Sequence, residues 1–487
     1  MKSIFDLEPK IVFHYFNEIC QVPRPSKHEE RIIQYLKDFG KKHKLETIAD
    51  ECGNILIKKP ATKGLENSQT VILQSHMDMV CEKNSDTIHD FMKDPIETVI
   101  DGKWLKAKGT TLGADNGIGV SAELAILASD DIEHGPIECL FTVDEETGLT
   151  GAFAMKKGFL GGDILINLDS EDEGELFIGC AGGIDTVATF EYKEQEVPAG
   201  SFFFRVTVKG LTGGHSGDDI NKNRANANKL LARYIYLLQS KHDVKICQIL
   251  GGNLHNAIAR EATALLAVPA KYKESVRIDL NLLSADIERE YAVTEPYMQW
   301  MLESESPVEK CIDDVTFKNL ILSIQGVQHG VFAMSQDIPG MVETSSNLAS
   351  IKMKEGNKIV IGTSQRSSIL SSRDDMANTI RATFLLAGAK ISHGDGYPGW
   401  KPNPKSAILA VAAESYKRLF NKEPKVLAIH AGLECGLFLE KYPNLDMVSF
   451  GTTLRGVHSP DERMEIATVA LWWEHLLDVL KNIPEAK

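Results

Sequence analysis

Short apolar runs that alternate with segments of helical length constrain the fold of this chain more than any other feature of its sequence. Apolar runs of strand length occur at 54–57, 71–74, 137–143 and 164–168, and the segment 118–127 between two of them has helical character. Such runs are typical of sheets buried on both faces, and their alternation with helices is typical of parallel sheets. The sequence therefore predicts an α/β architecture with a mostly parallel sheet.

A helical segment precedes this pattern. Ser26 and the glutamate three residues later, Glu29, have the spacing of a capping box, and Ile32, Leu36 and Phe39 follow at helical spacing. We therefore expect a helix whose first turn is capped by the Ser26 side chain.

The texture of the sequence changes after residue 183. An alternating, strand-like run at 202–209 and a charged helical stretch at 285–305 indicate a separate α+β unit, and the Gly/Pro-rich cluster at 394–400 ends it. From residue 406 the helix, strand, helix pattern resumes. We therefore predict a discontinuous α/β domain with a mostly parallel central sheet flanked by helices, and an inserted α+β domain. The predicted bounds are 1–184 with 395–487 for the first domain and 185–394 for the second.

Composition and charge argue against several classes of partner. The chain is 43% hydrophobic and 25% charged, and no segment approaches the ~18 consecutive apolar residues of a membrane span. Its 68 acidic residues outnumber its 53 basic ones, and the basic residues form no stripe for nucleic acid. The eight cysteines form no Cys-x-x-Cys pair, and no secretory leader is evident. We expect a cytoplasmic protein that binds neither nucleic acid nor membranes.

Acids and histidines fall just beyond the apolar runs. His76 and Asp78 follow the run at 71–74 and are two residues apart, so both side chains leave an extended segment on one face. Asp169 ends a later strand, and Asp115 lies in a glycine-rich loop before a helix. Ligands bind at the carboxyl ends of the strands in open α/β sheets, and a cation keeps crowded carboxylates ionised. A solvated turn explains any one of these sites but not all of them together.

The types of donor indicate the metal. Carboxylates with a few histidines and no thiolate favour Zn²⁺, with Mn²⁺ or Co²⁺ as alternatives. Glu145 and Glu146 end the strand at 137–143 and should point differently, so that one can bind a metal while the other acts on the attacking water. His458, between a strand-like run and the terminal helix, adds a second histidine. Two histidines and three acids suffice for two metal ions that share one carboxylate.

The order and spacing of these motifs resemble a known enzyme family. The motifs are His76-x-Asp78, Gly113-Ala-Asp115-Asn-Gly117, Glu145-Glu146-x-Gly148, Asp169, Gly213-Gly-His215-Ser-Gly217 and His458-Ser-Pro-Asp-Glu462. Together they look like the co-catalytic zinc exopeptidases that include carboxypeptidase G, peptidase T, aminoacylase and carnosinase. Further segments at 108–119, 179–185, 397–400 and 429–438 are similar to the aminoacyl-histidine (Xaa-His) dipeptidase branch. The resemblance extends from the N-terminal helices to the end of the chain.

The resemblance implies a role for each metal-site residue. Asp78 would orient His76, and Glu145 would be the general base. The implied ligands are His76 and Asp169 for one metal, Glu146 and His458 for the other, and Asp115 as the bridge between them.

The resemblance also assigns three residues of the inserted domain. His215 would stabilise the oxyanion, and Asn256 and Arg366 would contact the carboxylate of the substrate. The alternatives are a surface turn for His215 and structural hydrogen bonding for Asn256 and Arg366.

The implied activity is hydrolysis of small peptides by two divalent metal ions. The enzyme would cleave unblocked dipeptides, including Xaa-His dipeptides such as carnosine, when Glu145 activates a metal-bridging water. It would be a homodimer whose inserted domain closes as a lid. One alternative is an N-acyl amino-acid amidohydrolase with the same metals, which would accept a blocked amine. Another is an inactive, metal-stabilised binding protein, which would have lost Glu145 or a ligand, whereas all of them are present.

Overall fold

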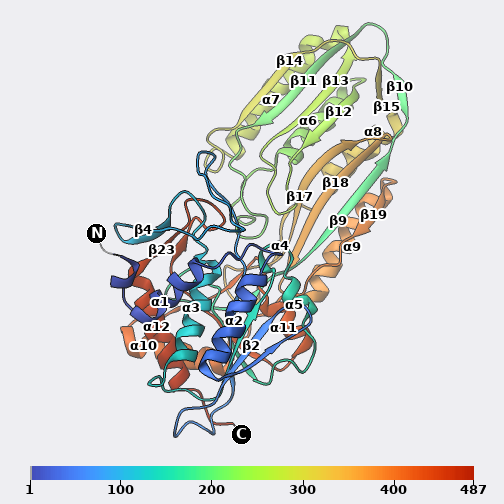
Figure 1. Ribbon diagram of the computed structural model, residues 1–487. Coiled ribbons are helices and arrows are strands. Elements are labelled where there is room, and N and C mark those ends of the chain that lie inside the picture. The colour runs from blue at the N-terminus through green and yellow to red at the C-terminus, as the bar shows by residue number, and fades with distance from the viewer. Residues whose placement is uncertain (1–2, 487) are drawn as a thin grey trace. The chain divides into compact units, whose positions relative to one another are not determined.

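The computed structural model describes residues 3–486, which fold into two compact units (Figure 1). The first unit comprises Met1–Gly179, Pro402–Ala428 and Leu433–Lys487, and the second comprises Cys180–Lys401 and Ile429–Gly432. The second unit is thus inserted into the first along the chain. The domain bounds predicted from the sequence, 1–184 with 395–487 and 185–394, stay a prediction beside these units.

The first unit is built on an eight-stranded sheet whose four central strands run parallel. These strands lie in the order β6 (Ile137–Thr142), β3 (Val71–His76), β7 (Ile164–Asn167) and β21 (Asp446–Ser449). Every residue of β3, β6 and β7 is buried, as their mostly apolar runs predicted. The outer strands are β1 (Glu46–Ala49) and β2 (Ile55–Lys59) at one edge, and β8 (Glu175–Cys180) and β20 (Lys425–Ile429) at the other. The predicted mostly parallel central sheet is confirmed.

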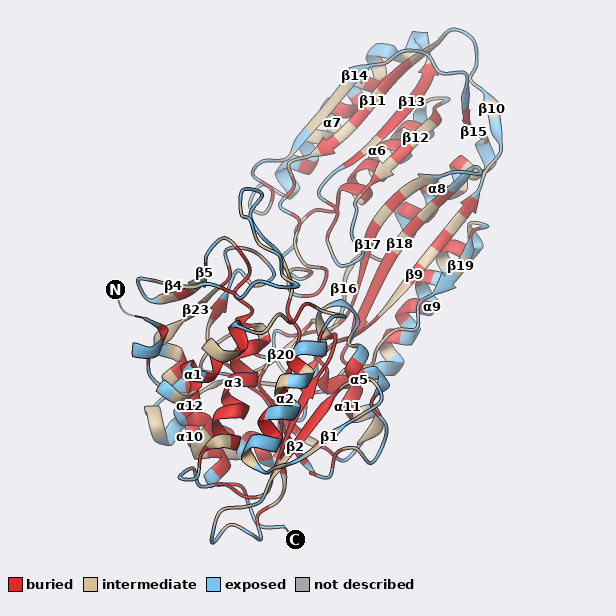
Figure 2. Cartoon of the chain, in the orientation of Figure 1, coloured by how far each residue is buried: buried red, intermediate tan, exposed pale blue. Residues whose placement is uncertain are grey.

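Helices pack against this sheet and against one another. The helix α3 (Ala114–Ala128) contacts β3 and α1 (Lys10–Cys20), and it is buried along most of its length (Figure 2). In the C-terminal part of the chain, α10 (Ala407–Phe420) contacts β21 and α12 (Ile466–Lys481). A separate four-stranded sheet is formed by β22 (Leu454–Arg455), β23 (Arg463–Glu465), β5 (Trp104–Ala107) and β4 (Thr98–Asp101).

The predicted capping box at Ser26 and Glu29 is wrong. The helix α2 runs over Glu30–His43, its N-cap residue is Glu29, and no side chain caps it. The Ser26 hydroxyl instead donates to the carboxylate of Asp78, and Glu29 accepts the backbone N–H of Asp144. Both side chains thus form tertiary hydrogen bonds, and the local bond that the Glu29 carboxylate accepts from the N–H of Lys27, at 2.8 Å, is not a helix cap.

The second unit repeats one arrangement twice along a single antiparallel sheet. One half lies in the order β14 (Gln299–Ser304), β11 (Ser201–Lys209), β13 (Ala262–Pro269) and β12 (Lys245–Gly251). The other half lies in the order β19 (Lys390–His393), β9 (Gly182–Glu191), β18 (Lys358–Ser367) and β17 (Val342–Lys354), with β16 (Gly330–Met334) paired to β17. In each half the strands follow the order fourth, first, third, second, which is that of a βαββαβ motif.

The helices of the second unit complete both motifs. They are α6 (Ala227–Lys241) and α7 (Lys273–Glu290) in the first half, and α8 (Asp314–Gly326) and α9 (Leu370–Leu386) in the second. Residues such as Val206 and Val208, which alternate along β11, form the core with Leu231 and Ile235 of α6. The predicted inserted α+β architecture is confirmed.

One predicted helix in this unit is wrong in its bounds. The stretch 285–305 was expected to be helical, but α7 ends at Glu290 and β14 begins at Gln299. The segment between them contains Pro296, which cannot continue a helix. The following residues gain ladder hydrogen bonds by pairing with β11. Within residues 3–486, no helix combines the length and apolarity needed to cross a membrane.

Candidate metal centre

The predicted metal ligands come from separate elements of the first unit. His76 is the last residue of β3, and Asp169 follows the end of β7. Glu146 lies in the short helix α4 (Glu145–Gly148), just after β6, and Asp115 lies in the first turn of α3. His458 lies between β22 and β23. Because the carboxyl ends of the parallel strands β3, β6 and β7 meet at one edge of the sheet, the fold gathers donors that are distant in sequence.

Two groups of three donors share Asp115. The first is His76, Asp115 and Asp169, and the second is Asp115, Glu146 and His458. His76 Nε2 lies 3.0 Å from Asp115 Oδ1 and 3.4 Å from Asp169 Oδ1. His458 Nε2 lies 3.2 Å from Asp115 Oδ2 and 3.0 Å from Glu146 Oε2. The two oxygens of Asp115 thus face different groups, as expected for a carboxylate that bridges two cations.

Asp78 connects the first donor group to the turn after β6. Its Oδ1 lies 3.2 Å from His76 Nδ1, and both side chains are almost fully buried. The same carboxylate accepts the backbone N–H groups of Glu145, at 3.1 Å, and Glu146, at 3.3 Å. A carboxylate on the second ring nitrogen of a histidine fixes the ring and leaves the other nitrogen for a metal. The 3.2 Å separation is compatible with that geometry, but His76 Nδ1 forms no hydrogen bond within residues 3–486, and the orienting role of Asp78 stays a prediction.

Burial and charge shift the pKa values of these donors strongly. Hydrogen bonds with Asp115 and Glu146 raise the pKa of His458 to about 11. Burial favours neutral His76, but the charge of Asp169 and hydrogen bonds with the surrounding carboxylates outweigh it and raise the pKa of His76 well above its usual value. Burial raises the pKa of Asp169 to about 6. Since metal ligands must be deprotonated, a cation bound here would displace protons, and its affinity would fall as the pH falls.

The donor set fits divalent cations. Glu146 Oε1 is buried and has no hydrogen-bond partner within residues 3–486, although buried carboxylate oxygens are normally paired. Oxygen and imidazole donors without thiolate suit Zn²⁺, Mn²⁺ or Co²⁺. The side chain of Glu145 forms no hydrogen bond or ion pair within the same residues, while its backbone is held by Asp78. Its carboxylate also forms a possible donor group with His76 and Glu146, so it lies beside both groups that share Asp115, and its role as the base stays a prediction.

Sequence reasoning missed a residue that ties the two donor groups together. Glu462 is 2% exposed, and its carboxylate accepts backbone N–H groups from four successive residues, Leu112 to Asp115, at 2.7, 3.0, 2.8 and 3.3 Å. An anion at the N-terminus of a helix is stabilised by these donors and by the helix dipole. Because Glu462 follows His458 by four residues, it fixes the loops of two ligands. The only sequence signal was its place in the His458 motif.

In the second unit, Arg366 lies at the centre of a polar cluster. It is 7% exposed and forms no ion pair with any described residue from 3 to 486. Its Nη1 donates to the hydroxyl of Tyr397 at 3.1 Å, and its Nε lies 3.4 Å from Ser216 Oγ. Tyr397 begins the segment 397–400, which resembles the aminoacyl-histidine dipeptidase branch, but it was not predicted as a site residue. A buried guanidinium without a carboxylate partner is a candidate site for an anion.

His215 also lies in this cluster. Its Nδ1 accepts the N–H groups of Gly217 and Asp218, each at 3.3 Å, and lies 3.4 Å from Asp218 Oδ2. Its Nε2 lies 3.4 Å from Nη2 of Arg366. The position of the ring proton decides whether this Nε2 accepts from the guanidinium or donates to a ligand. The side chain of Asn256 is exposed, and its backbone carbonyl accepts the N–H of Ser216.

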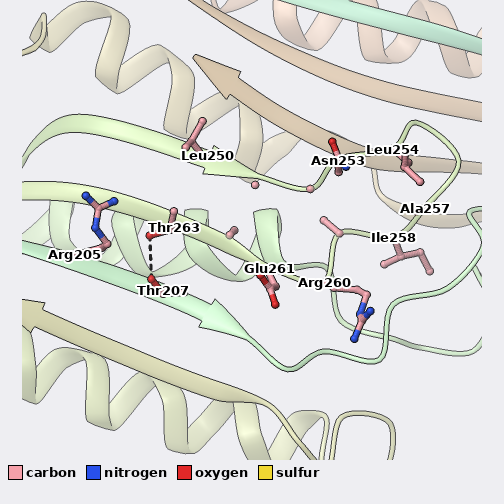
Figure 3. A pocket seen from close by; sticks show the side chains of 14 residues that line it. Arg205, Thr207, Leu250, Asn253, Leu254, Ala257, Ile258, Arg260, Glu261 and Thr263 are labelled. Atoms are coloured by element: carbon pink, nitrogen blue, oxygen red, sulfur yellow. Dashed lines mark hydrogen bonds between the residues drawn. The ribbon is translucent and has the colours of Figure 1, made fainter. Parts of the chain in front are cut away.

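The second unit also contains a cavity of about 660 Å³ (Figure 3). Its walls come from β11, β12 and β13 and the loop after β12, and they include Arg205, Leu250 and Ile258. None of the predicted site residues lines it, although Ala257 and Ile258 follow Asn256 in the chain. The cavity therefore gives no support to the predicted chemistry.

Two known proteins are similar to this chain over almost its whole length. The chain is 43% identical over 484 residues to the cytosol non-specific dipeptidase of Escherichia coli (strain K12), with 99% of this chain and 100% of that protein covered. The crystal structure of an aminoacylhistidine dipeptidase from Vibrio alginolyticus has a TM-score of 0.92 and 44% identity, and covers 100% of this chain and 99% of that one. A tripeptidase from Staphylococcus aureus shares the fold, with a TM-score of 0.58, 17% identity and coverage of 98% and 99%.

A protein family also matches most of the sequence. Peptidase family M20/M25/M40 matches residues 72–482, a range that contains all the predicted ligands and parts of both units. This match and the two relatives above 40% identity confirm the resemblance drawn from the motifs. The chain therefore belongs to peptidase family M20/M25/M40.

Proposed function

We propose that this chain is a metal-dependent dipeptidase that hydrolyses unblocked dipeptides, including Xaa-His dipeptides such as carnosine. The observation that carries the proposal is the pair of donor groups that share Asp115 beside the unpaired carboxylate of Glu145. Two relatives, 43% and 44% identical to almost the whole chain, bear the names of dipeptidases, one of them for aminoacylhistidine substrates.

Two metal ions are proposed to occupy the centre. His76 and Asp169 would hold one, Glu146 and His458 the other, and Asp115 both. We propose Zn²⁺, because imidazole and carboxylate donors without thiolate suit it, with Mn²⁺ and Co²⁺ as alternatives. When bound, such ions supply Lewis acidity toward the peptide carbonyl and the attacking water.

Glu145 is proposed as the general base. Its backbone N–H donates to Asp78, which fixes the position of the residue, while its carboxylate forms no hydrogen bond or ion pair within residues 3–486. Burial raises the pKa of Glu145 well above its usual value, which is the direction a base needs to take a proton near neutral pH and return it to the leaving amine. Asp78 acts by holding the turn that carries Glu145 and by orienting His76.

The free carboxylate of the substrate is proposed to bind Arg366, with Asn256 as a second contact. The guanidinium of Arg366 is buried without an ion-pair partner in residues 3–486, which leaves its charge for a ligand. In a dipeptide this carboxylate is one residue from the scissile bond, so a fixed cation there selects short substrates. Nε2 of His215, 3.4 Å from Nη2 of Arg366, is proposed to carry the ring proton and to stabilise the oxyanion.

Hydrolysis assays test the proposal directly. Purified protein is assayed with carnosine, Gly-His and N-acetyl-histidine, before and after chelation and again after Zn²⁺ or Mn²⁺ is restored. We expect metal-dependent cleavage of the two free dipeptides alone. Cleavage of N-acetyl-histidine would indicate an N-acyl amino-acid amidohydrolase instead. A protein that binds metal but cleaves none of the three would be a binding protein.

The cellular setting is part of the proposal. A cytoplasmic location is supported by the name of the relative from Escherichia coli, a cytosol dipeptidase. A homodimer is expected from the family resemblance, and light scattering of the purified chain tests it. A molar mass of one chain would contradict that expectation.

A further inference from the structure

The short connection between α1 and α2, residues 24–29, lies outside the part of the chain that the family match covers. The match begins at residue 72. Nevertheless, each of three polar side chains in this connection bonds to a loop of the candidate metal centre, and Arg24 bonds to two of them. None of these side chains belongs to the two donor groups that share Asp115, although Glu29 lies in a separate acidic group with Asp78 and Asp144.

Arg24 ties together two ligand-bearing loops. The residue is 2% exposed, and its Nη1 donates to the carbonyl of Asp78 at 2.8 Å, while its Nη2 donates to the carbonyl of Gly113 at 2.5 Å. The first contact fixes the chain just after His76. The second fixes the turn just before Asp115. A buried guanidinium costs free energy unless its N–H groups are hydrogen-bonded. Arg24 therefore holds the carbonyl groups of Asp78 and Gly113 in place.

The glycines around Asp115 make room for that guanidinium. A Cβ atom at Gly113 or at Gly117 would lie 2.6 Å from Nη2 of Arg24, which is closer than real Cβ contacts allow. Gly113 also has a positive φ of 67°, which glycine adopts readily. The two glycines and Arg24 therefore form one packing unit beside the bridging carboxylate.

Ser26 and Glu29 bond to the other side of the centre. Ser26 Oγ donates to Oδ2 of Asp78 at 2.8 Å, and Asp78 in turn contacts the ring of His76. Glu29 Oε1 accepts the backbone N–H of Asp144 at 3.1 Å, directly before Glu145. Within residues 3–486, Ser26 is the one side chain besides His76 that contacts the Asp78 carboxylate through a polar atom.

We infer that residues 24–29 are a positioning element for the metal centre, in which Ser26 acts through Asp78 on His76 and on the turn that carries Glu145. The inference rests on the proposed function for its effect on turnover, but its effect on metal binding is independent of the substrate. Partners of metal ligands are typically worth about 10–100-fold in metal affinity or activity.

The test compares Ser26→Ala with a matched serine. Ser415 is buried in the same unit and also donates to a carboxylate, that of Asp478, in the α10 and α12 pair. Metal affinity is measured by competition with a chelator, and Co²⁺ absorption spectra report the ligand geometry without turnover. We expect Ser26→Ala to weaken metal binding by about tenfold or more and to change the Co²⁺ spectrum, whereas Ser415→Ala changes neither.

Two further variants and kinetics complete the test. Ser26→Thr keeps the hydroxyl and should restore metal affinity. With dipeptide substrate, Ser26→Ala should lower kcat while KM changes less than about twofold, because Ser26 acts through ligand geometry and not on the substrate. Arg24→Lys keeps the charge but cannot reach both carbonyl groups, so it should weaken metal binding even if Ser26→Ala fails to fold.

The outcomes separate this inference from the proposed function. Equal metal affinities for Ser26→Ala and Ser415→Ala would overturn the inference, whether or not the wild-type chain cleaves dipeptides. A wild-type chain that binds metal but cleaves no dipeptide would overturn the proposed function, while the metal-affinity comparison would still decide the role of Ser26.

Discussion

Replacing Glu462 by glutamine tests whether the backbone clamp at the start of α3 sets the metal affinity. The two carboxylate oxygens of Glu462 divide four N–H groups between them: Oε2 accepts those of Leu112 and Gly113, and Oε1 accepts those of Ala114 and Asp115. Glutamine keeps one oxygen and puts an NH₂ group in place of the other. Two buried N–H groups would then face a donor and lose their acceptor.

The structure sets the size of the expected effect. A buried donor left without a partner costs about 1–3 kcal/mol, so the folded loop would carry a penalty of about 2–6 kcal/mol. The loop can relieve part of it only by moving, and Asp115 moves with it. We expect metal affinity to fall about 10–100-fold, which corresponds to about 1.4 to 2.8 kcal/mol, with the rest appearing as lower stability.

Chelator competition measures the metal affinity of Glu462→Gln. Glu465→Gln is the matched control: Glu465 lies three residues further along the chain, and its Oε1 is 3.0 Å from the exposed Nζ of Lys103. The same chemical change there removes a surface ion pair, which is worth little. If both variants bind metal as the wild type does, the clamp does not position Asp115, and the reasoning is refuted.

Three other predictions concern the base, the oxyanion donor and the pH. Glu145→Gln should keep metal affinity while kcat falls by about 10²–10⁴, and retained turnover would rule out the base. His215→Ala should lower kcat about 10²–10³-fold at unchanged metal content, whereas a loss confined to KM would indicate a substrate contact. Burial lowers the pKa of His475 to about 4, so the unfolded chain takes up this proton first and stability falls by about 2 kcal/mol from pH 7 to pH 5. In His475→Gln, the amide can still donate to the Ala412 carbonyl, as His475 Nε2 does. The free energy of unfolding, measured with urea at pH 7 and at pH 5, should therefore fall by about 2 kcal/mol less in this variant than in the wild type.

The fold was predictable where the signal is local. The runs at 71–74, 137–143 and 164–168 are mostly apolar because they become strands that are buried on both faces, and this signal can be read from each short segment by itself. The helix predicted over 285–305 was wrong because the charge pattern of this stretch suits an exposed helix and an exposed edge strand alike. The pairing of β14 with β11, almost 100 residues earlier, decides between them.

The clustering of the proposed metal ligands was predictable for a similar reason. His76, Glu146 and Asp169 lie at or just after the ends of strands whose carboxyl ends meet at one edge of the sheet. A residue's place relative to its strand therefore predicts where it lies in the fold. The positioning residues carry no such signal. Glu462 and Arg24 bond to backbone groups, and every residue except proline offers the same N–H and C=O, so no side-chain pattern marks the contact.

The error at Ser26 and Glu29 shows how local and tertiary hydrogen bonding compete. A serine hydroxyl and a glutamate carboxylate three residues apart can cap a helix, but the same groups can also reach a buried carboxylate or a distant N–H. Here Asp78 and the N–H of Asp144 are buried and need partners, and Ser26 and Glu29 bond to them while no side chain caps α2. A buried polar group without a partner costs about 1–3 kcal/mol, and the loss of a helix cap about 0.5–2 kcal/mol, so the tertiary contacts prevail. A capping pattern directly before a helix therefore predicts a cap only when no buried polar group lies within its reach.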